Sequence, residues 1–330
     1  MKNRVLSGMR PTGKLHLGNY HGALENWKGL QDTYDCFFFI ADWHALTSDY
    51  EDTANIESYI RDMVIDWLSV GLDPEKCTLF IQSHIKEHSE LYLLFSMITP
   101  VPWLERNPTY KEQIEQLSNK DLSTFGFLGY PVLQAADIVM YKAKGVPVGV
   151  DQIPHVELTR EIVRRFNHIF EEVFPEPKAI LTPTPKILGI DRRKMSKSYQ
   201  NAIFLCDSSE FIQKKVSQMI TDPQRMRKND PGDPSVCNVF TFHTLYSEQS
   251  MIDDMNNACK NAKIGCVDCK KKMAQSLISH LEPIRDKRTY YESKPNIVNE
   301  IIHNGEEKAR SVARETMNEV RSAVKTNYFN

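Results

Sequence analysis

The stretch that decides the fold is residues 5–20, VLSGMRPTGKLHLGNY. It opens with an apolar pair and passes through Gly8 into a turn that contains Pro11 and Gly13. Apolar residues followed by glycine and proline predict a strand, a tight turn and the start of a helix. Backbone N–H groups at a helix N-terminus favour phosphate, and a glycine lets a nucleotide approach the backbone. The candidate residues for a phosphate site are therefore His16, Gly18 and Asn19. A lone histidine is more often a capping or core residue, so this interpretation of His16 depends on a second phosphate site elsewhere in the chain.

The residues that follow alternate between strand and helix patterns. Continuous apolar runs predict strands buried on both faces, at residues 36–41, 78–82 and 146–149. Apolar residues at helical spacing predict helices at residues 55–70, 91–98 and 157–170. This alternation predicts an α/β fold with a doubly wound parallel sheet, a Rossmann-like arrangement. Ligands bind such sheets beyond the carboxyl ends of the strands, where Gly8, His44 and Gly149 would lie.

A second candidate phosphate site is the basic loop of residues 192–198, RRKMSKS. Most short runs of positive charge are solvated surface, and that reading applies to this loop taken alone. Its two lysines, Lys194 and Lys197, are three residues apart, and Ser196 and Ser198 flank Lys197. Lysines on a loop can clamp a polyphosphate, and hydroxyls and backbone N–H groups add hydrogen bonds. Together with the first site, the loop predicts a protein that stabilises a departing pyrophosphate.

Composition narrows the class of protein. The 330 residues are enough for one large or two modest domains. The net charge of −2 gives no general attraction to nucleic acid, so any RNA contact must come from local basic patches. No apolar run approaches the roughly 18–20 residues that span a bilayer. The first residues lead directly into a strand pattern, so we expect no signal peptide, a cytoplasmic location and reduced cysteines.

An apolar helix is predicted at residues 130–141, and it carries one carboxylate, Asp137. Tyr130, Gln134 and Asp137 are spaced four and three residues apart, so they share one helix face. An unpaired charge in such a setting is costly, so Asp137 needs a partner or a ligand. From the residues alone, a buried salt bridge or a cap is the favoured explanation over a binding site.

Residues 199–330 show few strand signals. Helices are predicted at residues 210–220, 251–262, 271–284 and 308–324. Basic stretches at residues 225–228 and 270–272 could meet RNA phosphates or remain solvated surface, and the pattern does not separate the two. The region is therefore expected to be a helical C-terminal domain.

Four of the seven cysteines lie in this region: Cys237, Cys259, Cys266 and Cys269. In a reducing cell, clustered thiols indicate a metal site rather than disulfides. Four thiolates suit Zn²⁺, which is the first interpretation of the spacing, and they also suit a [4Fe–4S] cluster. Unligated thiols are the third possibility. Cys36, Cys77 and Cys206 are expected to be packed thiols.

Longer strings carry a resemblance to a known family. His16-x-Gly18 early and Lys194-Met195-Ser196-Lys197-Ser198 late are similar to the two signatures of class I aminoacyl-tRNA synthetases. The strings SGMRPTGKLHLGNYHGAL, FIADWHALT, YPVLQAADIVMY, VPVGVDQIPHVELTREIVRRFN and KMSKSYQNAI resemble the tryptophanyl-tRNA synthetase family, from about Val5 to the C-terminus. The alternative is the tyrosyl-tRNA synthetases, which share the class I core and a Y-x-x-L-Q-x-x-D pattern. NYHGAL and ADWHALT favour the tryptophan enzymes.

The resemblance implies an activity and a domain plan. Tryptophan would attack the α-phosphate of ATP·Mg²⁺ to give an adenylate and pyrophosphate, and the adenylate would then esterify tRNA(Trp). Residues 1–203, with the 192–198 loop, would be the catalytic domain. Residues 204–330 would be an anticodon-binding domain whose last helix packs back on the catalytic domain. The family also implies a homodimer, and residues 111–123 would support the dimer contact and the acceptor end of tRNA.

The resemblance also implies residue roles. Catalysis would rest on Lys197, with Lys194, Ser196, His16 and Asn19. ATP would be bound by Arg10, Pro11, Thr12, His16, Gly18, Asn19, Gly149, Val150, Asp151, Ile187, Lys194, Met195, Ser196, Lys197 and Ser198. Tryptophan would be bound by Leu6, Gly8, Ala41, His44, Tyr130, Gln134, Asp137, Val146, Val148 and Gln152, with Asp137 accepting the indole N–H.

Three positions depart from the family pattern, and a fourth feature matches only a subset. Val150 replaces a glutamate, Asn19 a second histidine, and Gln134 the methionine of some relatives. The string IGCVDCKK is similar to that of bacterial members that hold a [4Fe–4S] cluster near the anticodon. The resemblance therefore implies this cluster, ahead of zinc, on Cys237, Cys259, Cys266 and Cys269.

Overall fold

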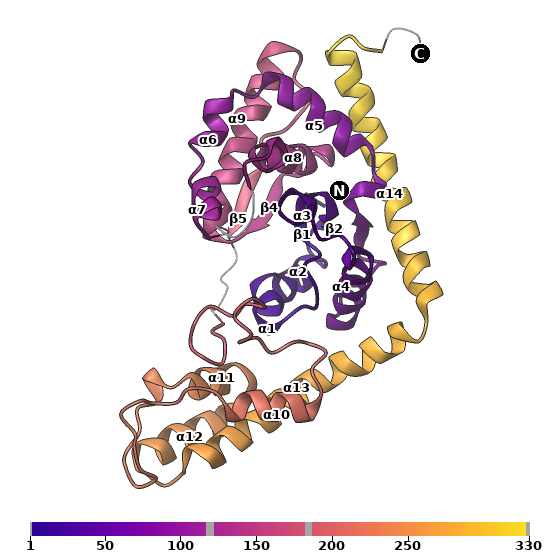
Figure 1. Cartoon of the computed structure of the whole chain (residues 1–330). Coiled ribbons are helices and arrows are strands. Elements are labelled where there is room, and N and C mark those ends of the chain that lie inside the picture. Colours follow the sequence, from indigo (N-terminus) through magenta and orange to yellow (C-terminus); the bar gives the residue numbers. More distant parts are fainter. Residues whose placement is uncertain (1, 117–121, 182–186, 328–330) are drawn as a thin grey trace. The chain divides into compact units, whose positions relative to one another are not determined.

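The computed structural model describes residues 2–116, 122–181 and 187–327 (Figure 1). The chain packs into two compact units. Unit 1 contains residues 1–13, 26–183 and 294–330, and unit 2 contains residues 14–25 and 184–293. These units follow packing rather than chain order, and the domain division at residue 203 stays a prediction.

Unit 1 is built on a five-stranded parallel sheet with the strand order β3-β2-β1-β4-β5. The strands are β1 (Arg4–Met9), β2 (Asp35–Ile40), β3 (Cys77–Ile81), β4 (Gly145–Val148) and β5 (Lys178–Leu181). The predicted doubly wound α/β fold is confirmed. The strand order reverses between β1 and β4, and in such sheets the crevice at the reversal is where ligands bind. Gly8 and Gly149 lie at this reversal, as predicted.

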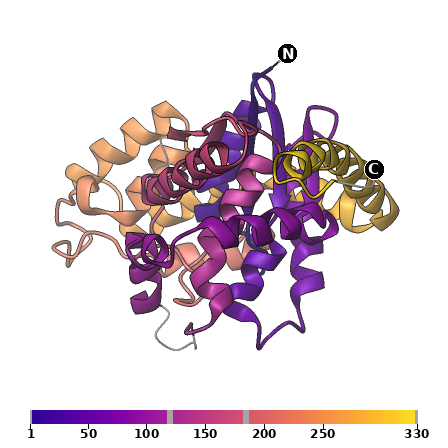
Figure 2. The same ribbon diagram turned by 90° about the horizontal axis from the view of Figure 1, so that it is seen from above.

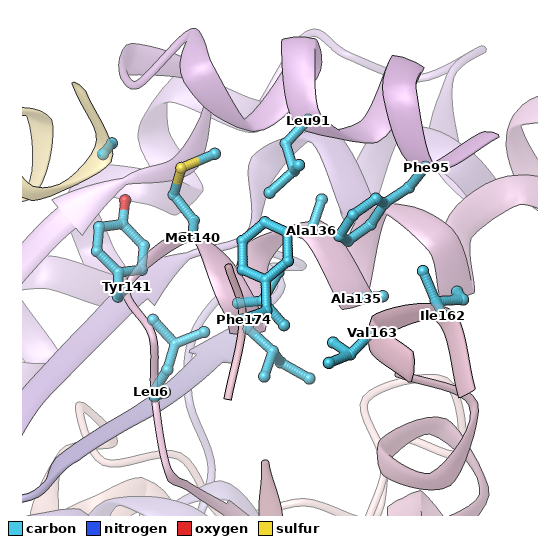
Figure 3. Packing of buried hydrophobic residues seen from close by; sticks show 14 of the residues in the cluster. Leu6, Leu91, Phe95, Ala135, Ala136, Met140, Tyr141, Ile162, Val163 and Phe174 are labelled. Carbon is cyan, nitrogen blue, oxygen red and sulfur yellow. The ribbon is translucent and has the colours of Figure 1, made fainter. Parts of the chain in front are cut away.

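Neighbouring residues of β2 point to opposite faces of the sheet, so both faces are apolar and helices cover both. Phe38 stacks on Trp27 of α2 (Glu25–Leu30), with ring centroids 4.5 Å apart. Phe37 faces the other way and stacks on Tyr141 at 4.9 Å. Figure 3 shows the core on that second face, where Leu6 of β1 lies among side chains from several helices. The remaining helices of unit 1 are α3 (Asp42–Asp49), α4 (Ile56–Val70), α5 (Glu87–Ile98), α6 (Val101–Glu105), α7 (Pro108–Gln116), α8 (Phe125–Met140), α9 (Ile153–Ile169) and α14 (Pro295–Ala323).

Three segments add to or differ from the sequence expectation. Strand β5 was not predicted. Helix α14 begins at Pro295, thirteen residues before the expected start at Lys308. Of residues 111–123, which the resemblance assigns to the dimer contact, residues 111–116 end helix α7, and residues 117–121 lie outside the described part of the chain.

Helix α14 returns to unit 1 after the chain has built unit 2. It runs beside α5, to which Arg321 is joined by hydrogen bonds of 2.8 and 2.6 Å to the Glu90 carboxylate (Figure 2). It also packs directly on β3, where a Cβ at Gly305 would overlap the carbonyl oxygen of Leu79. This close approach requires glycine at position 305.

Unit 2 is largely helical. It contains α1 (Leu17–Asn19), a π-helical turn (Tyr20–Leu24), α10 (Ser209–Ser217), α11 (Asn238–Tyr246), α12 (Gln249–Lys260) and α13 (Cys266–Glu292). Helix α13 is longer than the expected segment 271–284 because it starts at the cysteine pair and continues past Pro283. It packs against α10 and α11 and buries Leu277 and Leu281 fully. None of the helices in the described part of the chain is both long and apolar enough to cross a membrane.

Candidate active site

The lysine loop of unit 2 is held in shape by Asn201. The Asn201 side-chain oxygen accepts from the Ser196 N–H at 2.8 Å, and its amide donates to Asp191 at 2.7 Å and to the Lys194 carbonyl at 3.1 Å. Asn201 is buried, and Gly189 has no room for a side chain against it. The sequence analysis did not single out Asn201, although asparagine is typical of such local turns. The loop is therefore preformed rather than an open chain.

The ends of this loop are in an uncommon backbone conformation. Arg192 and Gln200 have φ angles of 67° and 54°, in the left-handed region that ordinary side chains rarely adopt. The Arg193 guanidinium lies 4.5 Å from the Tyr199 ring centroid and pairs with Asp191 at 2.7 Å. Between the two ends, the Lys194 side chain is exposed and the Lys197 side chain is half-buried. Such strain persists where surrounding contacts determine the conformation, and it is frequent at functional sites.

His16 caps the first helix of unit 2 reciprocally with Asn19. The Asn19 N–H donates to His16 Nδ1 at 3.3 Å, and the His16 N–H donates to Asn19 Oδ1 at 3.0 Å. Burial, and then the positive charge of Lys197, lower the pKa of His16 from 6.5 to about 4. The ring is therefore neutral near pH 7. Because its Nδ1 accepts a hydrogen bond, its Nε2 carries the proton and is a donor.

Both predicted phosphate motifs meet at Gly18. A Cβ at this position would lie 2.9 Å from the His16 ring and 3.6 Å from the Met195 Cβ. The chain thus brings His16 and Asn19 together with the lysine loop inside unit 2. A π-helical turn follows directly at Tyr20–Leu24, and such turns are frequent at functional sites.

Asp137 lies on α8 in unit 1, is fully buried, and has three side-chain donors. His44 Nε2 is 2.8 Å from Oδ2, His88 Nδ1 is 2.6 Å from Oδ1, and Gln82 Nε2 is 2.9 and 2.8 Å from the two oxygens. Burial would raise the pKa of the Asp137 carboxyl, but the hydrogen bonds and charges of His44 and His88 hold it below its ordinary value. The predicted need for a partner is therefore met within the protein.

Gln82 and His88 were not identified from the sequence. They follow β3 in the string IQSHIKEH, and His88 also bonds the Tyr141 hydroxyl through Nε2 at 2.7 Å. The only available signal was their position just after a predicted strand, where ligand contacts of parallel sheets gather. His44 was predicted, and it lies on α3.

A second series of hydrogen-bonded side chains in unit 1 contains two of the residues predicted to bind tryptophan, Tyr130 and Gln152. The Tyr130 hydroxyl is 2.9 Å from His155 Nε2, and His155 Nδ1 is 2.9 Å from Gln152 Oε1. Gln152 Nε2 then donates to Asp151 Oδ2 at 3.0 Å. Burial, and then the charge of His44, lower the pKa of His155 to about 4. His155 was missed by the sequence analysis.

The other residues predicted to bind tryptophan or ATP differ in how deeply they are buried. Leu6, Ala41 and Val146 are buried in the core of unit 1, and Gly8 lies under the Phe39 ring, which a Cβ would strike. Gln134 and Val148 are half-buried, and Val150 is 71% exposed.

The residues predicted to bind ATP divide between the two units. Unit 1 holds Arg10, Pro11, Thr12, Gly149, Val150 and Asp151, and unit 2 holds His16, Gly18, Asn19, Ile187, Lys194, Met195, Ser196, Lys197 and Ser198.

The four C-terminal cysteines gather in unit 2 around one arginine. Arg225 Nη1 is 3.7 Å from the Cys259 sulfur and 3.9 Å from the Cys266 sulfur. Burial, and then the charges of the three other thiols, raise the pKa of Cys269 to about 12. Within the described part of the chain, no three such side chains are grouped as ligands of a single metal ion.

Comparison with known proteins decides the family. Residues 1–282 match the model of the class I tRNA synthetases for tryptophan and tyrosine. A tryptophan–tRNA ligase of Thermotoga maritima is 53% identical over 323 residues, covering 97% of this chain and 98% of the relative. A ligase of the same name from Aquifex aeolicus is 46% identical, covering 97% of this chain and 99% of the relative. The chain belongs to the tryptophanyl-tRNA synthetases. It is an aminoacyl-tRNA ligase of class I.

Solved structures agree with this assignment. The tryptophanyl-tRNA synthetase of Campylobacter jejuni, in complex with ADP and tryptophan, matches with a TM-score of 0.91 and 34% identity over 98% of this chain and 99% of that one. A tyrosyl-tRNA synthetase of Archaeoglobus fulgidus, 20% identical over 87% of this chain and 90% of that one, has a TM-score of 0.66 and shares the fold alone. A tyrosyl-tRNA synthetase of Aeropyrum pernix matches over 96% of this chain, also with only 20% identity, and so likewise shares the fold alone.

Proposed function

We propose that this synthetase forms tryptophanyl adenylate from tryptophan and ATP with the His16 and lysine-loop cluster, and then transfers tryptophan to tRNA(Trp). The observation that carries the residue assignment is the convergence of His16, Gly18 and Met195, with Lys197 close enough to lower the pKa of His16. The first step needs positioning and charge stabilisation rather than a protein nucleophile.

In the proposed first step, the tryptophan carboxylate attacks the α-phosphate and pyrophosphate leaves. The neutral His16 donates a hydrogen bond from Nε2 to a phosphate oxygen and cannot act as a general acid near pH 7. Lys194 and Lys197 neutralise the charge that builds on the leaving pyrophosphate, and Ser196 adds hydrogen bonds. Mg²⁺ would enter with ATP as part of the substrate and would supply further positive charge.

Asp137 is proposed to select the indole. The carboxylate is ionised, and it is already engaged by Gln82, His44 and His88. An indole N–H, which is a donor only, would share or replace one of these hydrogen bonds. A phenylalanine side chain offers no donor and would gain nothing from the carboxylate. Sites built on such a hydrogen bond reject analogues that lack it by about 10⁴-fold or more.

The test of the proposed function is ATP–pyrophosphate exchange with each of the twenty amino acids, followed by charging of tRNA(Trp). Exchange should depend on tryptophan, and tyrosine should support it at a rate lower by orders of magnitude. Exchange with tyrosine and none with tryptophan would overturn the proposal. The proposal places the reaction in the cytoplasm, where charged tRNA is used.

We further propose that Cys237, Cys259, Cys266 and Cys269 hold a [4Fe–4S] cluster with a structural role. Burial, together with the neighbouring thiols, raises the pKa of Cys237, Cys259 and Cys269, so thiolates at these positions are unfavourable unless positive charge is supplied, and a cluster would supply it. Arg225 Nε is buried without a hydrogen-bond partner in the described structure, beside two of the sulfurs. Iron and sulfide should be found in anaerobically purified protein and be lost in Cys269→Ser. Zinc in their place would support the alternative metal.

A homodimer is part of the same proposal. Consecutive helices of unit 1 expose large apolar side chains, namely Leu93 and Met97 of α5, Val101 of α6, Ile114 of α7 and Phe125 of α8. Exposed apolar groups of this kind often mark protein interfaces. Sedimentation should give twice the monomer mass, and Met97→Glu should shift the equilibrium toward monomer. A monomeric wild type at micromolar concentration would contradict this part.

The helices of residues 204–293 are proposed to bind the anticodon. Basic stretches at residues 225–228 and 270–272 supply charge for RNA phosphates. Replacing Lys271 with alanine should weaken tRNA binding and its salt dependence without changing pyrophosphate exchange.

A further inference from the structure

We propose that His155 positions the groups that recognise the substrate's ammonium, by forcing both Tyr130 and Gln152 to present hydrogen-bond acceptors. The inference rests on the proposed function and on the family resemblance, which implies that Gln152, together with Tyr130, holds the ammonium group of tryptophan. His155 is a positioning residue in this scheme because it acts through its two neighbours.

The direction of the hydrogen bonds follows from Asp151, which lies at one end of this series of side chains. The Asp151 carboxylate only accepts, so the Gln152 side chain must turn its amide nitrogen toward it, at 3.0 Å. A flipped amide would instead place two oxygens against each other. The Gln152 oxygen therefore faces His155 Nδ1 at 2.9 Å.

The same logic fixes the tautomer of His155. Because the Gln152 oxygen only accepts, the proton of the imidazole lies on Nδ1, and Nε2 is left as an acceptor. Burial keeps the ring neutral, since the pKa of His155 is about 4, so a second proton is absent near pH 7. The Tyr130 hydroxyl, 2.9 Å away, must then donate to Nε2. Burial also raises the pKa of the Tyr130 phenol, so its proton is present.

The remaining hydrogen-bonding capacity of the two oxygens is of one kind. The Tyr130 oxygen has spent its proton on His155, and the Gln152 oxygen can only accept. One of the two N–H groups of the Gln152 amide donates to Asp151. An ammonium group is a donor only, so it suits the lone pairs on the Tyr130 and Gln152 oxygens, whereas a carbonyl, which only accepts, does not.

The scaffold holds His155 firmly. It lies in the first turn of α9, is 2% exposed, and its carbonyl accepts from the Thr159 hydroxyl at 2.8 Å. Asp151, at the far end of the hydrogen-bonded series, is anchored to α7, where the Thr109 hydroxyl donates to the Asp151 carbonyl at 3.3 Å. Fixed partners on both sides are what a recognition group needs to keep its orientation.

The test compares two ligands on the full-length protein by calorimetry. L-tryptophan carries the ammonium, and indole-3-propionic acid has the same indole and carboxylate without it. In His155→Phe, which keeps a ring but has neither nitrogen, the affinity for tryptophan should fall at least tenfold, and the affinity for indole-3-propionic acid should change less than twofold. Equal losses for both ligands, or no loss for tryptophan, would overturn the inference.

Two further variants keep the test decisive. Ser69→Ala removes a buried hydrogen bond of the same kind, from the Ser69 hydroxyl to the Ile65 carbonyl at 2.6 Å in α4, so it should lower thermal stability without changing the ratio of the two affinities. His155→Asn retains a donor near Nδ1 and should recover part of the tryptophan affinity; it also replaces His155→Phe if that variant does not fold. If the wild type fails to bind tryptophan at all, the proposed function fails. If it binds but the ratio is unchanged in both His155 variants, only this inference fails.

Discussion

His16 illustrates how the surroundings of a residue limit its chemistry. The ring is buried, its Nδ1 is used in the cap of α1, and Lys197 disfavours a positive charge on it. It can therefore donate one hydrogen bond but cannot deliver a proton near neutral pH. We therefore expect His16 to help position a phosphate group through one hydrogen bond, while Lys194 and Lys197 supply the positive charge.

Replacing His16 with asparagine should separate these functions. Asparagine is a good N-cap residue, so the helix start and the thermal stability should be kept. The donor at Nε2 is lost, so the rate of pyrophosphate exchange at saturating ATP should fall by about two to three orders of magnitude, the usual effect of removing one donor that acts on developing charge. His16→Ala should lose both rate and stability. A large stability loss in His16→Asn would show that the cap does not work as described.

Replacing Lys197 with alanine should depress adenylate formation far more than tryptophan affinity. The charge on pyrophosphate is greatest as it leaves, so kcat should fall by about 10²–10³-fold while the dissociation constant of tryptophan changes little. Arg192→Asn is the matched control, because it also removes a cation from the loop and asparagine tolerates the left-handed backbone there. Equal losses of rate and affinity in Lys197→Ala would indicate uniform binding instead.

At the scale of secondary-structure elements, most strands of the sheet could be predicted from the sequence, whereas the side-chain contacts made by the helices that cover the sheet could not. The runs at residues 36–41 and 78–82 were read correctly because strands buried on both faces leave continuous apolar sequence. Strand β5 has an exposed, intermediate and exposed pattern, so it gave no such signal. The lone carboxylate of α8 was visible in the sequence, but its partners Gln82 and His88 come from another element and are set by tertiary packing.

The contact of α14 with β3 depends on Gly305. Gly305→Ala should lower the free energy of unfolding by about 1–3 kcal/mol, because its Cβ would overlap backbone that cannot easily move. The control is Gly29→Ala in α2, where no atom lies within 4 Å and alanine should add roughly 0.5–1 kcal/mol. Urea denaturation of both variants measures the difference. A Gly305→Ala protein as stable as the wild type would mean that α14 does not approach β3 this closely.

At the scale of the whole molecule, buried neutral histidines should make the synthetase sensitive to acid. His16 and His155 have folded-state pKa values of about 4, below the ordinary 6.5. Between these values the unfolded chain binds more protons than the folded one, so the free energy of unfolding falls as pH falls. Above pH 6.5 both states are neutral at these sites and the full contribution remains.

The expected result is a urea midpoint that is flat from pH 7 to 8 and declines from pH 6.5 toward 4. His155→Phe lacks one of the two groups, so its midpoint should decline less steeply over the same interval. A wild-type midpoint that stays constant down to pH 4.5 would contradict the neutral state of these rings.

The path of the chain has a consequence for its synthesis. Residues 26–183 emerge from the ribosome early, but α14, which covers the edge strand β3, emerges last, after the whole of unit 2. Until then a nascent chain would carry an uncovered apolar sheet surface for more than a hundred residues of elongation. Prematurely terminated products would keep that surface permanently, which would mark them for chaperones and proteases.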